Sequence, residues 1–265
     1  PESLRTEIER LAAEYRFLHW HLAFPEVLRT AGSGDAAVGD GPGWTGGFDV
    51  VLGNPPWERL KLQEQEFFAA RNPEIAQAQN AAARRRMIDR LIEDDPALHT
   101  AFLEARRTAE GESHLVRNSG RYPLCGRGDV NTYSIFAETK CLLLGPSGRV
   151  GTIVPTGIAT DDTTKYFFQH IVDHHMLVSY FGFKNERFLF PRPVEHTVTF
   201  GLLTLDARAV PGRIMEFCWN VWTVEEMKDP ARRIELSAED IALLNPNTRT
   251  GPVFRTRRDA EITKA

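Results

Sequence analysis

The sequence predicts an α/β protein that forms the second half of an open sheet with helices beside it. Short apolar runs bounded by glycine or proline alternate with longer segments in which apolar residues recur at helical spacing. Their order along the chain is strand, helices, strand, helix, strand, strand, which is the alternation of an α/β sheet. The last two strands are separated by too few residues for a helical crossover, so we expect them to pair antiparallel.

The amino-terminal part of the chain predicts a helix, a loop and a strand. Residues 2–18 place leucine, isoleucine and tyrosine at helical spacing, with charged residues between them. Residues 30–47 are rich in glycine and are expected to form a mobile loop. Residues 48–53, with the sequence FDVVLG, form a short apolar run that is typical of a buried parallel strand.

Residues 58–130 are expected to form a helical insertion. Within it, residues 58–110 are rich in alanine, glutamate, glutamine and arginine and predict two or three helices. Pro73 and Pro96 predict breaks between these helices, because proline lacks the N–H that continues the helical hydrogen bonds. Residues 111–130 are rich in glycine and arginine and predict a loop.

The rest of the chain predicts one more helix–strand alternation and then a looser pattern. A helix over residues 132–144 is expected to end at Gly145-Pro146. After it we expect a strand over 149–154, a helix over 161–175, and strands over 176–183 and 197–205. Residues 1–206 therefore predict one partial domain. Residues 207–265 are expected to be a linker and the start of a downstream region, with one further strand at 213–219.

The composition excludes several classes of protein. No apolar run approaches the length of a membrane helix, so no membrane association is expected. Three cysteines, odd in number and widely spaced, argue against a disulfide framework or a zinc site and favour a reducing cytoplasm. We therefore expect no metal. The formal net charge of -4 means that any basic face for nucleic acid is local.

The most informative motif is Asn54-Pro55-Pro56-Trp57, which directly follows the predicted strand. Ligands bind at strand ends in open α/β sheets. An aromatic amino nitrogen is a poor nucleophile, because its lone pair is delocalised into the ring. The side-chain oxygen of Asn54 and the carbonyl of Pro55 can accept its two protons and free that lone pair. Two prolines fix two φ angles and preorganise the carbonyl. Trp57 offers a flat face on which a base can stack.

A simpler interpretation of these four residues is a turn that ends the strand. Asn-Pro begins many turns, and Pro-Pro is common in loops. The preceding apolar strand favours the catalytic interpretation, and the segments around it favour it further.

Several segments, taken in order, resemble one enzyme family. FDVVLGNPPW at 48–57 resembles motif IV of the γ-type N6-adenine DNA methyltransferases. It is still more similar to the large restriction–modification and phage-exclusion (BREX- or DISARM-like) methyltransferases, in which a phrase such as FLHWHLAFPEV at 17–27 precedes the motif. The later segments that resemble motifs V, VI and VIII are Asn131-Thr132-Tyr133 with Phe136, residues 145–155, and residues 189–191 with 197–200. The resemblance covers roughly residues 15–205.

This resemblance implies the second half of a Rossmann-like methyltransferase sheet that uses S-adenosyl-L-methionine. The reaction would be methyl transfer to the N6 amino group of a flipped adenine in double-stranded DNA, for restriction–modification or anti-phage defence. It implies catalytic roles for Asn54, Pro55, Pro56 and Trp57. By the same resemblance, Phe190 and Trp57 stack on the base and Phe136 lines the cofactor pocket. Other subunits of a restriction or defence system are the implied partners.

One departure from the family is the missing cofactor loop. The family has a D-P-x-x-G-S-G type of glycine loop after its first strand. The glycines at 31–34 and 126–128 follow no apolar strand and are expected to be flexible loops. Because the chain also begins without methionine, we expect a piece of a longer protein. The cofactor loop is expected upstream of Pro1 and a target-recognition domain downstream of Ala265.

The basic and histidine residues outside the motif have two interpretations each. Arg117, Arg121 and Arg127 precede motif V, and either contact DNA or belong to a solvated loop. His170, His174 and His175 resemble the spacing of helical metal ligands, but a position at a helix end explains them better.

Two other functions stay open. An RNA or protein-glutamine amino-methyltransferase also uses N-P-P-aromatic, although the phrase at 17–27 and the long insertion favour the large DNA enzymes. The other is a non-catalytic DNA-binding or assembly subunit with a remnant site, against which the intact Asn54 and Trp57 argue.

Overall fold

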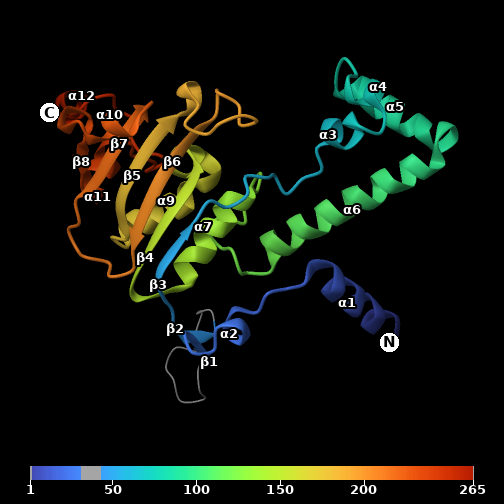
Figure 1. Cartoon of the computed structure of the whole chain (residues 1–265), viewed down its shortest axis with the longest axis horizontal. Helices are drawn as coiled ribbons and strands as arrows, with labels where there is room; N and C mark the ends of the chain where they lie inside the picture. Colours follow the sequence, from blue (N-terminus) through green and yellow to red (C-terminus); the bar gives the residue numbers. More distant parts are fainter. Residues whose placement is uncertain (1, 31–42, 265) are drawn as a thin grey trace.

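The computed structural model of the chain describes residues 2–30 and 43–264 (Figure 1). Its centre is a six-stranded sheet with the strand order β3-β4-β6-β5-β7-β8. In chain order these strands are β3 (Phe48–Gly53), β4 (Leu144–Pro155), β5 (Leu177–Lys184), β6 (Thr199–Asp206), β7 (Met215–Val221) and β8 (Ile234–Leu236). The α/β class predicted from the sequence is confirmed.

The sheet is mixed, and its first two strands are parallel. β3 runs parallel to β4, and β5 runs parallel to β7. β6 pairs antiparallel with both β4 and β5 and therefore lies between them. The expectation that strands 176–183 and 197–205 pair antiparallel is confirmed.

The main core is formed where helices cover the sheet. In β4 every second side chain from Val150 to Val154 is buried, as the two-residue period of a strand requires. Val150 and Val154 share one cluster with buried residues of α7 (Thr132–Leu142), α8 (Gly157–Thr160) and α9 (Lys165–Asp173). A short 3₁₀ helix, η1 (Asp162–Thr164), connects α8 to α9.

The prediction that residues 48–53 form a buried strand is correct for the strand and wrong for its burial. β3 lies at the edge of the sheet, and no described strand pairs with its outer side. Val51 packs on the main core, whereas Val50 is 59% exposed and Leu52 is 74% exposed. An apolar run predicts that a strand is buried, but it does not show which neighbouring elements would cover the strand.

The helical insertion has four helices where two or three were expected. They are α3 (Glu64–Ala69), α4 (Pro73–Ala76), α5 (Ala81–Asp94) and α6 (Pro96–Asn118), and they extend from the sheet as an arm (Figure 1). Pro73 and Pro96 are the breaks that the sequence predicts, since each occupies the first position of a new helix. The loop expected over 111–130 is wrong for its first part, because α6 continues through Gly111 to Asn118.

Two boundaries near the sheet also differ from the sequence prediction. The helix expected to stop at Gly145-Pro146 ends at Leu142, and Gly145-Pro146 lie inside β4. The mobile loop expected over 30–47 contains β2 (Trp44–Gly46), which pairs antiparallel with β1 (Leu28–Thr30). The middle of that loop and its glycines at 31–34 lie outside the described residues.

The amino-terminal helices precede this hairpin. α1 (Glu2–Tyr15) carries exposed residues along nearly its whole length, and α2 (Trp20–Ala23) leads into β1. The Tyr15 hydroxyl donates to Glu112 of α6 at 3.0 Å. None of the helices in the described ranges could cross a lipid bilayer.

The linker expected after residue 206 is instead part of the sheet and of its core. β7 and β8 extend the sheet, and Trp219 and Ile241 belong to the main cluster. The elements between and after these strands are α10 (Val224–Lys228), η3 (Pro230–Arg232), α11 (Ala238–Leu244) and α12 (Arg257–Lys264). The apolar residues of this region fall in short, interrupted runs, so their pattern does not reveal a shared core.

Candidate functional site

The candidate site lies where β3 ends, beside the end of its parallel neighbour β4. Asn54-Pro55-Pro56-Trp57 form the turn that follows β3. Asn54 and Pro56 are exposed, Pro55 is buried and Trp57 is half-buried. The buried proline anchors the turn, so the amide of Asn54 is presented to solvent from a restrained backbone.

Two oxygen acceptors in this turn are unused. In the part of the chain that the structure describes, neither the Asn54 side chain nor the Pro55 carbonyl makes a hydrogen bond. The carbonyl of Pro56 differs, because Thr132 Oγ1 donates to it at 2.7 Å. Thr132 Oγ1 also accepts from the N–H of Glu58 at 3.0 Å. Thr132, at the start of α7, therefore fixes the chain after the turn and engages neither of the two earlier acceptors.

A buried lysine holds the peptide that precedes Asn54. Lys140 of α7 is 7% exposed, and its Nζ donates to Thr152 Oγ1 at 2.5 Å and to the Gly53 carbonyl at 3.4 Å. Thr152 Oγ1 donates to the same carbonyl at 3.0 Å. Burial lowers the pKa of Lys140 to about 8. The last carbonyl of β3 is thus held by two side chains, which restrains the start of the turn.

Trp57 packs on an aromatic cluster that Phe190 also contacts. The buried members of this cluster are Phe183, Phe200, Cys218 and Val221. Trp57 and Phe190 lie against them from segments far apart in the sequence. The ring of Phe190 meets that of Phe200 edge-on, with centroids 4.7 Å apart. The two aromatic residues singled out from the sequence therefore share one cluster, and a base stacked between them stays a prediction.

The three phenylalanines of the segment after β5 differ in exposure. Phe183 is 3% exposed and stacks on Phe200 at 5.3 Å, so its role is structural. Phe188 is 44% exposed and has a φ of +53°, which is strained for a residue with a bulky side chain. Phe190 is half-buried. Only Phe190 combines contact with the Trp57 cluster and partial access to solvent.

Phe136, the residue expected in the cofactor pocket, is 44% exposed although Ile135 and Ala137 beside it are buried. Its ring is therefore available for stacking. Gly126 of the other glycine segment is structural, because a Cβ there would lie 2.6 Å from the carbonyl oxygen of Tyr122. That contact leaves no room for a phosphate cradle.

The three arginines expected to touch DNA lie around the loop before α7. Arg117 Nη2 donates to the carbonyl of Gly128 at 2.5 Å. Arg127 donates to the carbonyl of Pro123 at 3.0 Å and stacks over Tyr166 at 4.6 Å. Arg121 is exposed. Two of these guanidinium groups thus stabilise the loop, and DNA contact by the set stays a prediction.

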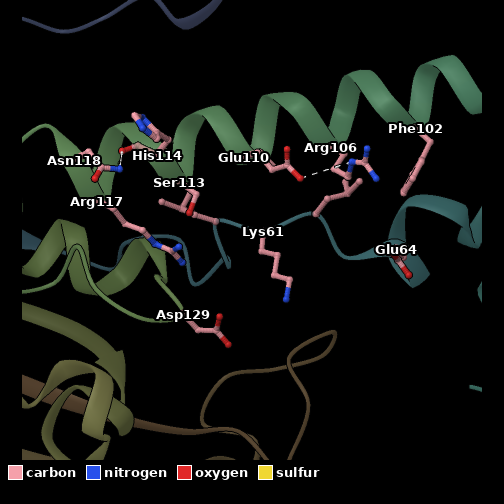
Figure 2. A pocket seen from close by; sticks show the side chains of 13 residues that line it. Lys61, Glu64, Phe102, Arg106, Glu110, Ser113, His114, Arg117, Asn118 and Asp129 are labelled. Carbon is pink, nitrogen blue, oxygen red and sulfur yellow. Dashed lines mark hydrogen bonds and ion pairs between the residues drawn. The ribbon is translucent and has the colours of Figure 1, made fainter. Parts of the chain in front are cut away.

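A groove of about 590 Å³ runs along α6, beside the chain that follows Trp57 (Figure 2). Basic and acidic side chains alternate along it, and Arg106 pairs with Glu110 at 3.7 Å. Since the two signs of charge balance, the groove has no evident preference for an anion.

The histidines have the structural position that the sequence favours. His174 caps the carboxyl end of α9, and its ring lies 4.0 Å from that of His170. Burial lowers the pKa of His170. No group of three potential metal ligands occurs within residues 2–30 and 43–264.

Sequence reasoning missed the residues that support the turn and the aromatic cluster. Lys140 and Thr152 give no local signal, because each acts on a carbonyl far away in the chain. Asn185 does give a local signal, because it directly follows an apolar strand, as Asn54 does. A polar residue directly after an apolar strand is therefore a local signal for both Asn54 and Asn185.

One family model matches the amino-terminal third of the chain. Residues 2–88, which include β3 and the turn at 54–57, match the family model of the Eco57I restriction-modification methylase. No curated protein matches the chain.

Three solved structures are similar at low identity. The methyltransferase subunit of a type I restriction-modification system from Streptococcus thermophilus is 14% identical over 78% of this chain and 39% of its own, with a TM-score of 0.41. A DrdV–DNA complex is 15% identical over 69% and 16%, with a TM-score of 0.35. The ATP-dependent Type ISP restriction-modification enzyme LlaBIII bound to DNA is 7% identical over 65% and 10%, with a TM-score of 0.33. The chain spans about two fifths of the length of the first of these proteins.

Proposed function

We propose that this chain is the catalytic part of a DNA methyltransferase that transfers a methyl group from S-adenosyl-L-methionine to N6 of a flipped adenine. The observation that carries the proposal is the pair of acceptors on Asn54 and Pro55, which have no hydrogen-bond partner among the described residues. The family match over residues 2–88 includes this turn and supports the methyltransferase class. The biological context we propose is restriction–modification or anti-phage defence.

The chemistry needs two acceptors at one end of a restrained turn. Asn54 Oδ1 would accept one proton of the adenine amino group, and the Pro55 carbonyl would accept the other. These bonds draw the nitrogen toward tetrahedral geometry and localise its lone pair for attack on the methyl carbon. Because the turn is fixed by Pro55-Pro56 and by Thr132, little reorganisation is needed during the reaction.

The same site offers aromatic surfaces for a base outside its stack. A flipped base loses stacking worth a few kcal/mol, which the protein must replace. We propose that Trp57 covers one face and that Phe190 contacts the other, since both pack on one cluster at the end of the sheet. Each contact of this kind is worth about 1–3 kcal/mol.

The described residues fit the cofactor in part. The exposed ring of Phe136 suits stacking on an adenine moiety. Gly126 is occupied structurally, and no other described segment combines a glycine loop with a preceding strand. We propose that the main cofactor loop belongs to a segment upstream of Pro1. The unpaired outer edge of β3, with Val50 and Leu52 exposed, offers a place where such a segment could extend the sheet. When bound, the cofactor supplies the activated methyl group.

The proposed partners are double-stranded DNA and other subunits of a restriction or defence system. Arg121 is the best placed of the three arginines for phosphate contact, because it is exposed and has no side-chain bond among the residues described here. We propose that target recognition resides downstream of Ala265.

The test uses the complete protein that contains this chain. Methyl-free DNA, RNA and a glutamine-containing protein are offered in parallel with methyl-labelled S-adenosyl-L-methionine. DNA alone should become labelled. Asn54→Ala should lower the rate about 100-fold or more, since it removes one hydrogen bond at the reacting nitrogen, and should leave cofactor affinity unchanged.

The matched control is Asn247→Ala, which removes an exposed asparagine side chain outside the candidate turn. It should retain the full rate. Labelling of RNA or protein in place of DNA, or full activity in Asn54→Ala, would contradict the proposal.

A further inference from the structure

Asn185 is a fully buried amide directly after β5, at the start of the segment that carries Phe190. Its exposed fraction is 0%. Asn185 Nδ2 donates to the carbonyl of Phe190 at 3.1 Å and to the carbonyl of Glu195 at 3.2 Å. Its Oδ1 accepts from the N–H of Phe190 at 2.8 Å. One side chain therefore joins both sides of the loop that spans residues 186–196.

The chemistry of the amide explains why this position holds asparagine. Both N–H groups and the oxygen of the side chain are engaged, so nothing polar on it is left without a partner. A carboxylate at the same place would lose both donors and would face two carbonyl oxygens. An apolar side chain of the same size would leave the main chain of Phe190 unpaired in a buried environment.

These bonds act directly on the two aromatic residues of the loop. Phe190 has both its N–H and its carbonyl held by Asn185, which fixes the direction of its ring against Phe200. The main-chain carbonyl of Asn185 accepts from the N–H of Phe188 at 2.7 Å. That bond closes the short 3₁₀ turn η2 (Asn185–Arg187), and Phe188, with its positive φ, caps the carboxyl end of that turn. The side chain of Asn185 therefore orients Phe190, whereas its bond to Phe188 involves only the main chain.

We infer that Asn185 is a positioning residue that orients Phe190 for capture of the extruded base. The inference rests on the proposed function. It assigns Asn185 to base capture and not to the methyl-transfer step, which belongs to Asn54. Loss of the amide should therefore weaken retention of the base while methyl transfer to an easily extruded base survives.

The experiment compares variants of the complete protein on two DNA duplexes. The duplexes contain the sequence that the wild-type protein methylates. In the first, 2-aminopurine replaces the target adenine and reports extrusion by its fluorescence. In the second, the target adenine faces a mismatched base, which lowers the energy needed to extrude it.

The variants are Asn185→Asp and Asn185→Ser, with Asn54→Ala and Phe190→Ala for comparison. The matched control is Asn245→Asp, because Asn245 Nδ2 also closes a loop by donating to Thr250 Oγ1 at 2.8 Å, and it makes no bond to the segment that carries Phe190 among the described residues. Asn185→Ser avoids a buried charge and keeps the test informative if Asn185→Asp does not fold.

The expected result has three parts. The Asn185 variants should lose roughly 10- to 100-fold in base capture, as Phe190→Ala does, because the same stacking contact is lost. The mismatch should restore most of their turnover and should not restore that of Asn54→Ala. Cofactor affinity and the Asn245→Asp control should be unchanged.

Wild-type fluorescence and KM in a folded Asn185 variant, with Phe190→Ala impaired, would overturn the inference. So would failure of the mismatch to restore turnover. Absence of methyl transfer by the wild-type protein would instead overturn the proposed function, so the two failures are distinguishable.

Discussion

At the residue scale, the proposed function depends on which polar atoms of the turn already have a hydrogen-bond partner. The carbonyl of Pro56 accepts from Thr132, and that of Gly53 accepts from Thr152 and Lys140. Between them, Asn54 and the Pro55 carbonyl contact no donor within the described ranges. The turn is therefore held from both ends, and we propose that the two acceptors at its centre bind the substrate.

The roles of Phe188 and Phe190 can be separated by substitution. Phe190→Ala should weaken capture of a flipped base by roughly 10- to 100-fold while the fold survives, because Phe190 contacts the cluster of Trp57. Phe188→Ala should have a smaller effect, since Phe188 points to solvent at 44% exposure. Fluorescence of 2-aminopurine at the target position measures the effect of each substitution on base capture. Normal capture in Phe190→Ala with loss in Phe188→Ala would assign the stacking role to Phe188.

Lys140 predicts a pH dependence of stability. Its pKa is lowered from 10.5 to about 8 because the ammonium is desolvated. Between these values the unfolded chain binds more protons, so stability should rise with pH and be lowest below about 8. The free energy of unfolding of Lys140→Met, relative to that of the wild type, should be higher at pH 7 than at pH 10 by roughly 1–3 kcal/mol. Urea unfolding of both proteins from pH 7 to 10 tests this, and parallel curves would disprove it.

At the element scale, the helical arm and the sheet have separate cores. Phe68, Ile88 and Phe102 belong to a cluster of the arm that shares no buried member with the main core. The arm follows the candidate turn in the sequence, and α7 follows the arm. A defect in the arm should therefore remain local.

The substitution Phe68→Ala tests this separation. It should destabilise the arm by about 3–5 kcal/mol, because it leaves a cavity in a small cluster. Hydrogen exchange should accelerate in α3 to α6 and stay unchanged in β4 and β6. Val154→Ala, in the main core, is the matched control and should show the opposite pattern. Equal acceleration throughout the chain in Phe68→Ala would show a single cooperative unit.

The sequence predicts those elements that are formed by interactions between residues close together in the chain. The strands at 48–53, 149–154, 176–183 and 197–205 were predicted because an apolar run is a local signal. The sequence does not predict that β3 is exposed or that β7 and β8 join the sheet, because both depend on which segments become neighbours in space. Asn54 could be found from four consecutive residues, whereas Lys140 lies 87 positions from the carbonyl that it contacts.

At the scale of the whole molecule, β3 and β8 are the two edge strands of the sheet, and their surroundings differ. β7 and β8, with α11 and α12, complete the end beyond β5. The opposite end is β3, whose outer edge pairs with none of the strands that the structure describes. The candidate turn lies at this edge, where we propose that the cofactor-binding segment joins the sheet.

This arrangement predicts how the 265-residue chain behaves alone. It should bind S-adenosyl-L-methionine weakly and should not methylate DNA, because Phe136 contributes one stacking surface without a glycine loop. Calorimetry with the cofactor measures this, with the complete protein as the positive control. Micromolar one-to-one binding by the chain alone would show that the cofactor site lies within these residues.

The most direct test of the central claim identifies the nucleoside that carries the methyl group. DNA treated with the complete protein and S-adenosyl-L-methionine is digested to nucleosides and measured by mass spectrometry. We predict N6-methyladenine with the wild-type protein and its loss by about 100-fold or more with Asn54→Ala. Methylcytosine as the product, or equal N6-methyladenine from both proteins, would contradict the account.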